Sequence, residues 1–437
     1  MIRNARQSTP AQVAETEYQA LKTAIHTELV ESLDLAAVGQ IHGDQMRAEV
    51  RELTGDVIKA RRLKLTPDQL ERLYTDIDNE VFGLGPLEAL MADPTISDIL
   101  VNGAQEVYVE RRGRMEKSDV VFADDDHVMR IIQRIVARIS RRVDEVSPLV
   151  DARLPDGSRV NAVIPPLALD GPKLSIRRFA KDRLHLDELL EGQSLSSAMS
   201  AFLEAAVAAR VSFMISGGTG AGKTTLLNAL SGAIPDDERI VTIEDSAELL
   251  LQNPHVVRME TRPANSEGTG EFTQRDLVKN SLRMRPDRII VGEVRGPEAL
   301  DMLQAMNTGH EGSLTTIHAN DARDALARLE MMVAMSGFEL PVNVVRNYVA
   351  AGIGLVVHVA RLKGGVRRIT RIAEIVSSTA DGYVLEDVFR FRQQGLDEQG
   401  AARGEFYATG YTPRCLERFA DAGVEINTSL FTRLEGE

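Results

Sequence analysis

The segment GGTGAGKTT, residues 217–225, constrains the fold more than any other stretch of the chain. It follows the apolar run VSFMIS and precedes KTTLLNAL, which has the composition of a helix. Gly217, Gly222, Lys223 and Thr224 match G-x-x-x-x-G-K-[ST], in which backbone N–H groups surround phosphate oxygens at a helix N-terminus. The strand–loop–helix order therefore predicts a phosphate-binding turn in an α/β fold with a mainly parallel sheet.

A loop of this kind binds phosphate, but hydrolysis needs a carboxylate that orients a water molecule and positive charge at the γ-phosphate. Lys223 is expected to reach the β- and γ-phosphates of ATP, and the Thr224 hydroxyl is expected to bind Mg²⁺. The residues predicted to cradle the nucleotide are Gly217, Gly218, Thr219, Gly220, Ala221, Gly222, Lys223, Thr224 and Thr225.

Two later apolar strands end in carboxylates. RIVTIEDSAE contains Glu244, Asp245 and Glu248, and RIIVGE ends at Glu293. Ligands of parallel sheets collect at the carboxyl ends of the strands, so these acids are predicted to face the nucleotide. The second strand resembles a Walker B strand, with Gly292 where many such strands carry an Mg²⁺-linked Asp. Glu293 is therefore expected to act on the metal side or as the base.

Two histidines complete the predicted site. His318 lies in LTTIHAN, directly after a further strand-like run, and His310 lies in NTGHEGS. A neutral imidazole can contact the γ-phosphate or hold a catalytic carboxylate by a hydrogen bond. Both residues are candidates for this role, against the alternative that each is a histidine satisfied within the core.

Patterns along the chain indicate several parts. TPDQ marks a helix start, because Thr66 can cap, Pro67 suits the first helical position and Gln69 completes a capping box. Strand–helix alternation begins near residue 197. The predicted parts are a disordered 1–15, a helical bundle or arm 16–82, an α+β domain 83–180, a linker with a short helix 181–196, and an ATPase-type domain 197–437.

Composition restricts the possible functions. The formal net charge of −14 argues against a nucleic-acid binder, which would usually show a strongly basic face. The single cysteine, Cys415, excludes an intrachain disulfide framework and a multi-cysteine zinc site. No apolar run approaches the ~20 residues that span a bilayer, so we expect a cytoplasmic protein that reaches membranes through a partner.

The motifs occur in a recognisable order. GGTGAGKTT, RIVTIEDSAEL, RMRPDRIIVGEVRG and GHEGSLTTIHAND resemble the Walker A, Asp, Walker B and His boxes of secretion traffic ATPases, which serve type II and type IV secretion and type IV pili. FGLGPLEAL, ISDILVNG, LPDGSRVNAVIPP and ATGYTPRCLERFADAG are similar to the CpaF/TadA branch, the motor of tight-adherence (Flp) pili. The resemblance covers about residues 80–437.

The resemblance implies a RecA-like ATPase domain preceded by a PAS-like domain, six copies in a ring, and nucleotide between domains and neighbours. It implies that Glu248 activates water, that Glu293 is the Walker B glutamate and that His318 is the His-box residue. ATP and Mg²⁺ are the expected cofactors, and no zinc is expected because the four-cysteine module of the type II branch is missing.

The family also directs arginines toward the phosphates. Arg177 and Arg178 in SIRRF match that stretch, Arg159 in DGSRVN is a further candidate, and Arg283 and Arg285 in RMRPD are family-type positions. Because side chains alternate along a strand, we expect only one of Arg177 and Arg178 to contact phosphate, and which one stays open.

The function implied is a hexameric motor that drives assembly, or also retraction, of a Tad/Flp pilus. It would act through polytopic platform proteins at the cytoplasmic face of the bacterial inner membrane. The alternatives are a type IV secretion ATPase that transfers protein or DNA, and a nucleotide-gated scaffold with little hydrolysis.

Overall fold

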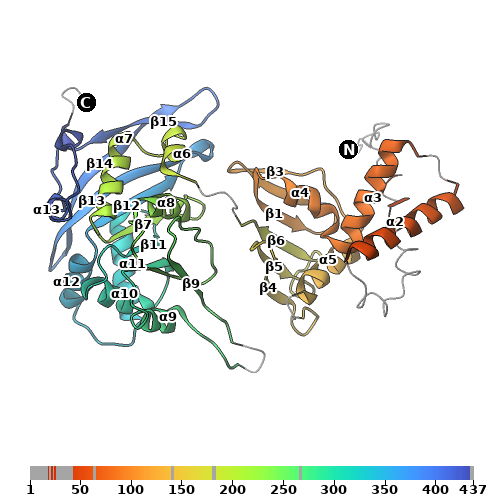
Figure 1. Cartoon of the computed structure of the whole chain (residues 1–437), viewed down its shortest axis with the longest axis horizontal. Helices are drawn as coiled ribbons and strands as arrows, with labels where there is room; N and C mark the ends of the chain where they lie inside the picture. The colour runs from red at the N-terminus through yellow and green to blue at the C-terminus, as the bar shows by residue number, and fades with distance from the viewer. Residues whose placement is uncertain are drawn as a thin grey trace, which may run out of the picture. The chain divides into compact units, whose positions relative to one another are not determined.

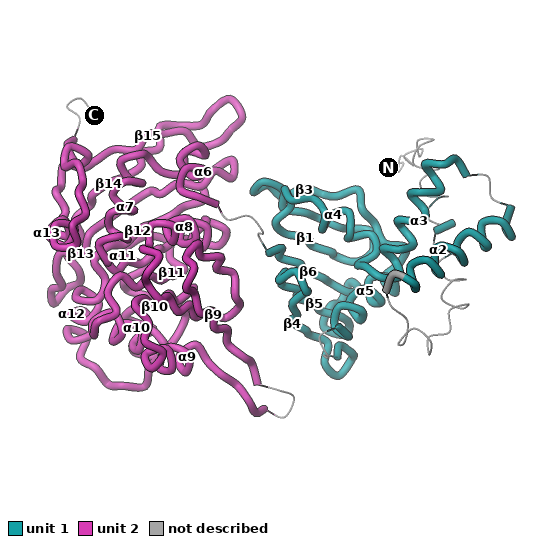
Figure 2. The backbone as a smooth tube through the Cα atoms, viewed as in Figure 1, with its two compact units in different colours: residues 1–179 teal, residues 180–437 magenta. Residues whose placement is uncertain are grey.

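The computed structural model describes residues 18, 21–22, 24–25, 43–62, 65–138, 142–179, 184–264 and 268–433. The chain forms two compact units, Met1–Phe179 and Ala180–Glu437 (Figure 2). The stretch predicted to be disordered, 1–15, lies outside the described residues. No helix of the described ranges is long and apolar enough to cross a membrane.

The first unit contains two amphipathic helices, α2 (Gly43–Ala60) and α3 (Pro67–Phe82), and residues 18, 21–22 and 24–25 before them are also helical. The predicted start of α3 is confirmed: Thr66 Oγ1 accepts the Gln69 N–H at 3.3 Å, and Gln69 Oε1 accepts the Thr66 N–H at 3.0 Å. The apolar faces of the helical segments meet in one small core, formed by Ile25, Val50, Leu73 and Ile77.

An antiparallel six-stranded sheet follows, in the order β3-β2-β1-β6-β5-β4. One helix, α5 (Asp125–Ala137), packs its apolar stripe into the core of this sheet, and the Asp124 side chain caps its N-terminus. The strands and the short helix before them are α4 (Glu88–Ala92), β1 (Ile96–Asn102), β2 (Val107–Arg111), β3 (Arg114–Lys117), β4 (Leu149–Arg153), β5 (Arg159–Val163) and β6 (Lys173–Arg177).

The second unit contains a nine-stranded sheet in the order β15-β14-β13-β12-β7-β11-β10-β8-β9 (Figure 1). The strands from β12 to β9 in this order are parallel, and β13, β14 and β15 add an antiparallel extension. This confirms the predicted α/β class. The strands are β7 (Phe213–Gly217), β8 (Ile240–Glu244), β9 (Val256–Glu260), β10 (Arg288–Val294), β11 (Leu314–His318), β12 (Leu355–Arg361), β13 (Arg367–Thr379), β14 (Gly382–Leu396) and β15 (Ala402–Ala408).

Two apolar clusters cover the two faces of the sheet, because side chains alternate along each strand. Phe213 and Ile215 enter one cluster, and Met214 between them enters the other. Leucines of α6, inside the predicted linker, pack on the first cluster, so this stretch belongs to the second unit. The helices are α6 (Leu186–Glu191), α7 (Ser197–Ala208), α8 (Lys223–Leu230), α9 (Gln274–Ser281), α10 (Glu298–Asn307), α11 (Ala322–Ala334), α12 (Val342–Gly352) and α13 (Leu416–Asp421).

A buried ion pair fixes the start of β10 and leads to a stability prediction. Arg288 is fully buried, and its Nη2 donates to Glu238 Oε1 at 2.9 Å. Glu238→Ala should lower the free energy of unfolding by about 3–5 kcal/mol, because it leaves a buried guanidinium without its counter-charge. Urea denaturation followed by circular dichroism measures this loss.

Arg210→Ala is the matched control for that prediction. Arg210 also contacts Glu238, with its Nε 3.2 Å from Oε1, but its side chain is 43% exposed. Removing it should cost less than about 1 kcal/mol, since exposed pairs contribute little. If Glu238→Ala and Arg210→Ala lowered the free energy of unfolding equally, the burial of Arg288 would not be the cause of the loss.

Candidate nucleotide-binding site

The predicted motifs meet at the carboxyl edge of the central parallel strands. In the sheet, β7 lies beside β11 (Figure 1), and β10 and β8 follow in the strand order. Parallel pairing aligns His318 with Gly217, so the His box stands directly next to the phosphate loop. Glu244 ends β8 at this edge, and Glu293 lies near the end of β10.

The loop has the backbone that a phosphate cradle requires. Gly220 and Gly222 adopt φ of 67° and 101°, a region that residues with a Cβ avoid. A Cβ on Gly217 would lie 2.3 Å from the carbonyl oxygen of Val359 in β12. The loop therefore needs glycine at these positions for backbone conformation and for close approach to the neighbouring strand.

Lys223 begins α8 and turns back over the loop. Its Nζ donates to the carbonyl oxygens of Gly217 at 3.0 Å and Gly218 at 3.1 Å. Burial lowers the pKa of Lys223, and the nearby Glu293 and Glu248 act in the opposite direction. The ammonium thus stands at the mouth of the loop, within the electrostatic reach of two carboxylates.

A bulge directs the end of β10 toward this edge. The pairing of β10 with β11 slips between Val291 and Val294, so Gly292 and Glu293 form an irregular step. Bulges change the direction of side chains and are frequent beside active sites. Glu293 is half-buried there, and Arg295 Nε donates to its Oε2 at 2.9 Å.

Arg295 connects two of the predicted boxes, and sequence analysis did not single it out. Besides Glu293 it contacts Asp245, with Nη1 3.1 Å from Oδ2. Asp245 directly follows β8 and Glu293 lies on β10, so one guanidinium pairs with both carboxylates and connects the ends of these two strands. The only sequence signal was its place two residues after the Walker B glutamate.

Two further arginines lie next to the loop, Arg361 at the end of β12 and Arg367 at the start of β13. Arg367 Nε donates to the Gly220 carbonyl oxygen at 3.0 Å. A Cβ on Gly220 would lie 3.3 Å from Arg361 Nη1, and one on Gly222 would lie 3.3 Å from Arg367 Cδ. No sequence signal predicted these neighbours, because about 140 residues separate them from the loop and only the pairing of β12 with β7 brings them there.

The predicted residues His310, Arg283 and Arg285 lie elsewhere in this subunit. All three precede the first residue of a strand, β11 or β10, and so occupy the amino edge of the sheet. Beside His310, the Gly312 N–H donates to Ser212 Oγ at 3.0 Å, and Ser212 comes before β7. The structure therefore does not bring these residues to the phosphate loop of the same chain.

The predicted arginines of the first unit form a separate group. Arg159 and Arg177 are direct partners across β5 and β6. Arg177 Nε lies 3.1 Å from Asp98 Oδ1, and Arg178 Nη1 donates to the Ile96 carbonyl oxygen at 2.9 Å. Arg177 is exposed and Arg178 is half-buried. Their contact with nucleotide remains a prediction.

A small apolar hollow adjoins the loop. It has a volume of about 200 Å³ and lies beside Gly222, at the N-terminus of α8. Its walls come from α6, α8, β12 and β13, and they include Leu189, Leu195, Thr225, Val359 and Ile369. The hollow shares Ala221, Gly222 and Thr225 with the predicted phosphate-binding residues.

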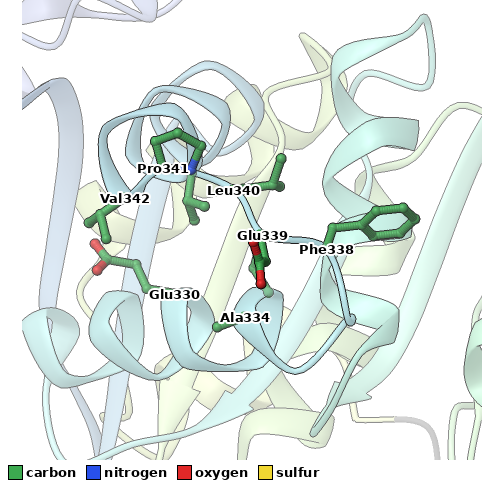
Figure 3. A pocket seen from close by; sticks show the side chains of 9 residues that line it. Glu330, Ala334, Phe338, Glu339, Leu340, Pro341 and Val342 are labelled. Carbon is green, nitrogen blue, oxygen red and sulfur yellow. The ribbon is translucent and has the colours of Figure 1, made fainter.

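The structure has a larger hollow of about 510 Å³, whose lining residues Figure 3 shows from close by. Phe338, Leu340 and Val342 line it, together with the C-terminal turns of α11. That helix starts just after the His box and has 13 residues, which corresponds to a length of roughly 20 Å. The larger hollow is therefore not part of the phosphate site.

The residues present fit a magnesium nucleotide. Among the described residues no group of three or more His, Cys, Asp or Glu side chains is arranged to hold a metal ion by itself. Mg²⁺ in nucleotide sites needs only one or two protein oxygens, since phosphates and waters supply the rest. Thr224, the second residue of α8, offers a hydroxyl oxygen and Glu293 offers a carboxylate oxygen, and Mg²⁺ prefers ligands of this kind.

Comparisons with known proteins identify a family and several relatives of this chain. A family described as type II/IV secretion system protein matches residues 80–381. A putative conjugal transfer protein of Mycobacterium tuberculosis is 40% identical over 332 residues, which cover 75% of this chain and 93% of that protein. The type IV secretion system protein PtlH of Bordetella pertussis is 35% identical over 320 residues, which cover 67% and 94%.

Among solved structures, the pilus retraction motor PilT with bound ADP aligns with a TM-score of 0.50. The alignment covers 68% of this chain and 84% of that chain, at 21% sequence identity. At this level of identity the likeness concerns the fold alone.

Proposed function

Because this chain belongs to the type II/IV secretion system protein family, whose members are ATPases, we propose that it hydrolyses MgATP to drive transfer through a type IV secretion system. One observation carries this proposal. A phosphate loop, with Lys223 at its mouth, shares one sheet edge with two half-buried carboxylates, Glu248 and Glu293.

Each group has a distinct role in the proposed reaction. The loop N–H groups and Lys223 hold the β- and γ-phosphates, and Glu248 orients the attacking water and takes its proton. When bound, Mg²⁺ neutralises charge on the phosphates. Thr224 and Glu293 are the residues proposed to hold it, and His318 is proposed to contact the γ-phosphate or a carboxylate. The apolar hollow beside Gly222 is the place we assign to the base.

The descriptions of the relatives favour a type IV secretion system, and not a pilus, as the system in which this chain acts. The Mycobacterium tuberculosis protein is described as a putative conjugal transfer protein, and PtlH as a type IV secretion system protein. The second candidate is assembly of a Tad/Flp pilus. It is favoured by the similarity of FGLGPLEAL, LPDGSRVNAVIPP and ATGYTPRCLERFADAG to the CpaF/TadA branch.

A deletion strain distinguishes the two systems. The strain is complemented with the wild-type gene or with Glu248→Gln, and secreted or transferred macromolecules and surface pili are measured in parallel. Loss of transfer with normal pili supports the first proposal. Loss of pili with normal transfer overturns it in favour of the second, and loss of neither overturns both.

We further propose a homo-hexameric ring that docks on polytopic membrane platform proteins at the cytoplasmic face of the inner membrane. Nucleotide shared between neighbours would stabilise such a ring, because a ligand stabilises the form that binds it. Native mass spectrometry with a non-hydrolysable ATP analogue should therefore detect six subunits. Only monomers at all protein concentrations would contradict the ring.

A further inference from the structure

The glycine of the Walker B strand makes room for a side chain from the neighbouring strand. A Cβ on Gly292 would lie 2.9 Å from Glu244 Cγ, closer than real Cβ contacts come. Gly292 does not adopt a positive φ, so its backbone conformation alone does not require glycine. The space above Gly292 is filled by the middle of the Glu244 side chain, and this side chain is only 3% exposed.

Glu244 uses this position to hold the segment that follows β8. Its Oε2 accepts the N–H of Glu248 at 2.6 Å and the N–H of Leu249 at 2.9 Å. The next residue, Leu250, is tied to the helix after the phosphate loop, because its N–H donates to Asn228 Oδ1 at 2.9 Å. The backbone around Glu248 is thus fixed from two sides, by β8 and by α8.

The burial of Glu244 indicates that this contact is specific. Burial raises the pKa of the Glu244 carboxyl, and the two backbone N–H groups act against that shift. Oε1 has no hydrogen-bond partner among the described residues. An unsatisfied buried oxygen costs stability, so the carboxyl is held here for the contact that its other oxygen makes.

We propose that Glu244 is a positioning residue, which holds the backbone of Glu248 so that this carboxylate faces the γ-phosphate, and that Gly292 is glycine because it must admit Glu244. The proposal rests on the proposed role of Glu248 as the base. It goes beyond that role, because it assigns to Glu244 a hydrogen-bonding function that needs an acceptor oxygen and not a negative charge.

This distinction makes the inference testable with isosteric variants. Glutamine has the length of glutamate, and its amide oxygen accepts the same two N–H groups. Glu244→Gln should therefore keep kcat within about threefold of wild type. Glu244→Ala should lower kcat about 100-fold with little change in KM, because misplacement of a catalytic group by about 1 Å has an effect of this size.

Gly292→Ala is a second, independent variant. Its methyl group displaces Glu244 without removing it, so kcat should fall as in Glu244→Ala. The exposed Glu260 is the matched control, since it ends β9 in register with Glu244. Glu260→Ala should behave as wild type.

Hydrogen exchange provides a readout that does not depend on turnover. In Glu244→Ala and Gly292→Ala, the amides of residues 248 and 249 should exchange faster than in wild type, and in Glu244→Gln they should stay protected. If Glu244→Gln loses kcat as fully as Glu244→Ala, the carboxylate has a chemical role and the inference is overturned. Wild-type kcat and protection in Gly292→Ala would overturn it as well.

The same experiments separate this inference from the proposed function. Loss of protection at residues 248 and 249 with unchanged kcat would confirm the contact but show that turnover does not need it, which overturns the positioning role and leaves the proposed base untouched. Normal turnover by Glu248→Gln would overturn the proposed base directly, whatever Glu244 does.

Discussion

Glu248→Gln is expected to lower the rate of ATP hydrolysis about 10³-fold while nucleotide affinity stays close to wild type. A positioned general base contributes about 10²–10⁴-fold to a rate, and an amide cannot take the proton of the attacking water. Glutamine preserves the length of the side chain and the backbone N–H that Glu244 accepts. Phosphate release measures turnover, and a fluorescent ATP analogue measures binding.

Glu425→Gln is the control for this substitution. Glu425 is exposed and follows α13, far along the chain from the phosphate loop and the two strand ends that carry the predicted acids. The control should hydrolyse ATP at the wild-type rate. If Glu248→Gln retained wild-type turnover too, Glu293 would become the remaining glutamate proposed for water activation.

Lys223→Ala should weaken nucleotide binding about 100-fold and abolish measurable hydrolysis at ordinary ATP concentrations. Hydrogen bonds to charged groups contribute about 1.5–3 kcal/mol each, and 1.4 kcal/mol corresponds to a tenfold change in affinity. In the structure Lys223 Nζ already stands between the carbonyls of Gly217 and Gly218, so the ammonium needs little movement to meet phosphate oxygens. Calorimetric titration with ATP and Mg²⁺ measures the loss.

The control for Lys223 is Lys279→Ala. Lys279 lies on α9, is about half-exposed, and its Nζ is 3.8 Å from Asp301 Oδ1. Its removal deletes one positive charge from the same unit and should leave affinity unchanged. A large loss of binding in both variants would show that overall charge, and not the loop ammonium, determines affinity.

Local patterns in the sequence were sufficient to predict several elements of this site. The phosphate loop, the strand ends that carry Glu244 and Glu293, and the capping box at Thr66 each depend on a few consecutive residues. Hydrogen bonding and side-chain periodicity over such short stretches follow directly from residue type. The α/β class could be predicted because parallel strands on both sides of the loop are continuous apolar runs.

Residues that meet through the sheet could not be predicted in this way. Arg367 touches the loop only because β12 pairs with β7, and Arg295 bridges two boxes only because β10 lies beside β8. His310 belongs to the motif around the His box but precedes β11, so in this subunit it lies at the opposite edge of the sheet from His318. Its contact with nucleotide stays a prediction, because closeness in sequence does not show at which end of a strand a residue lies.

The sequence by itself predicted a phosphate-binding strand–loop–helix turn and placed acidic residues at the ends of two later strands. Only the tertiary structure showed where each of those acidic side chains lies. Glu244 is buried beneath the site, where Gly292 leaves space for it, and Glu248 and Glu293 stand near Lys223. The physical reason is that residue type sets what a side chain can do, whereas strand order and close packing set what it can reach.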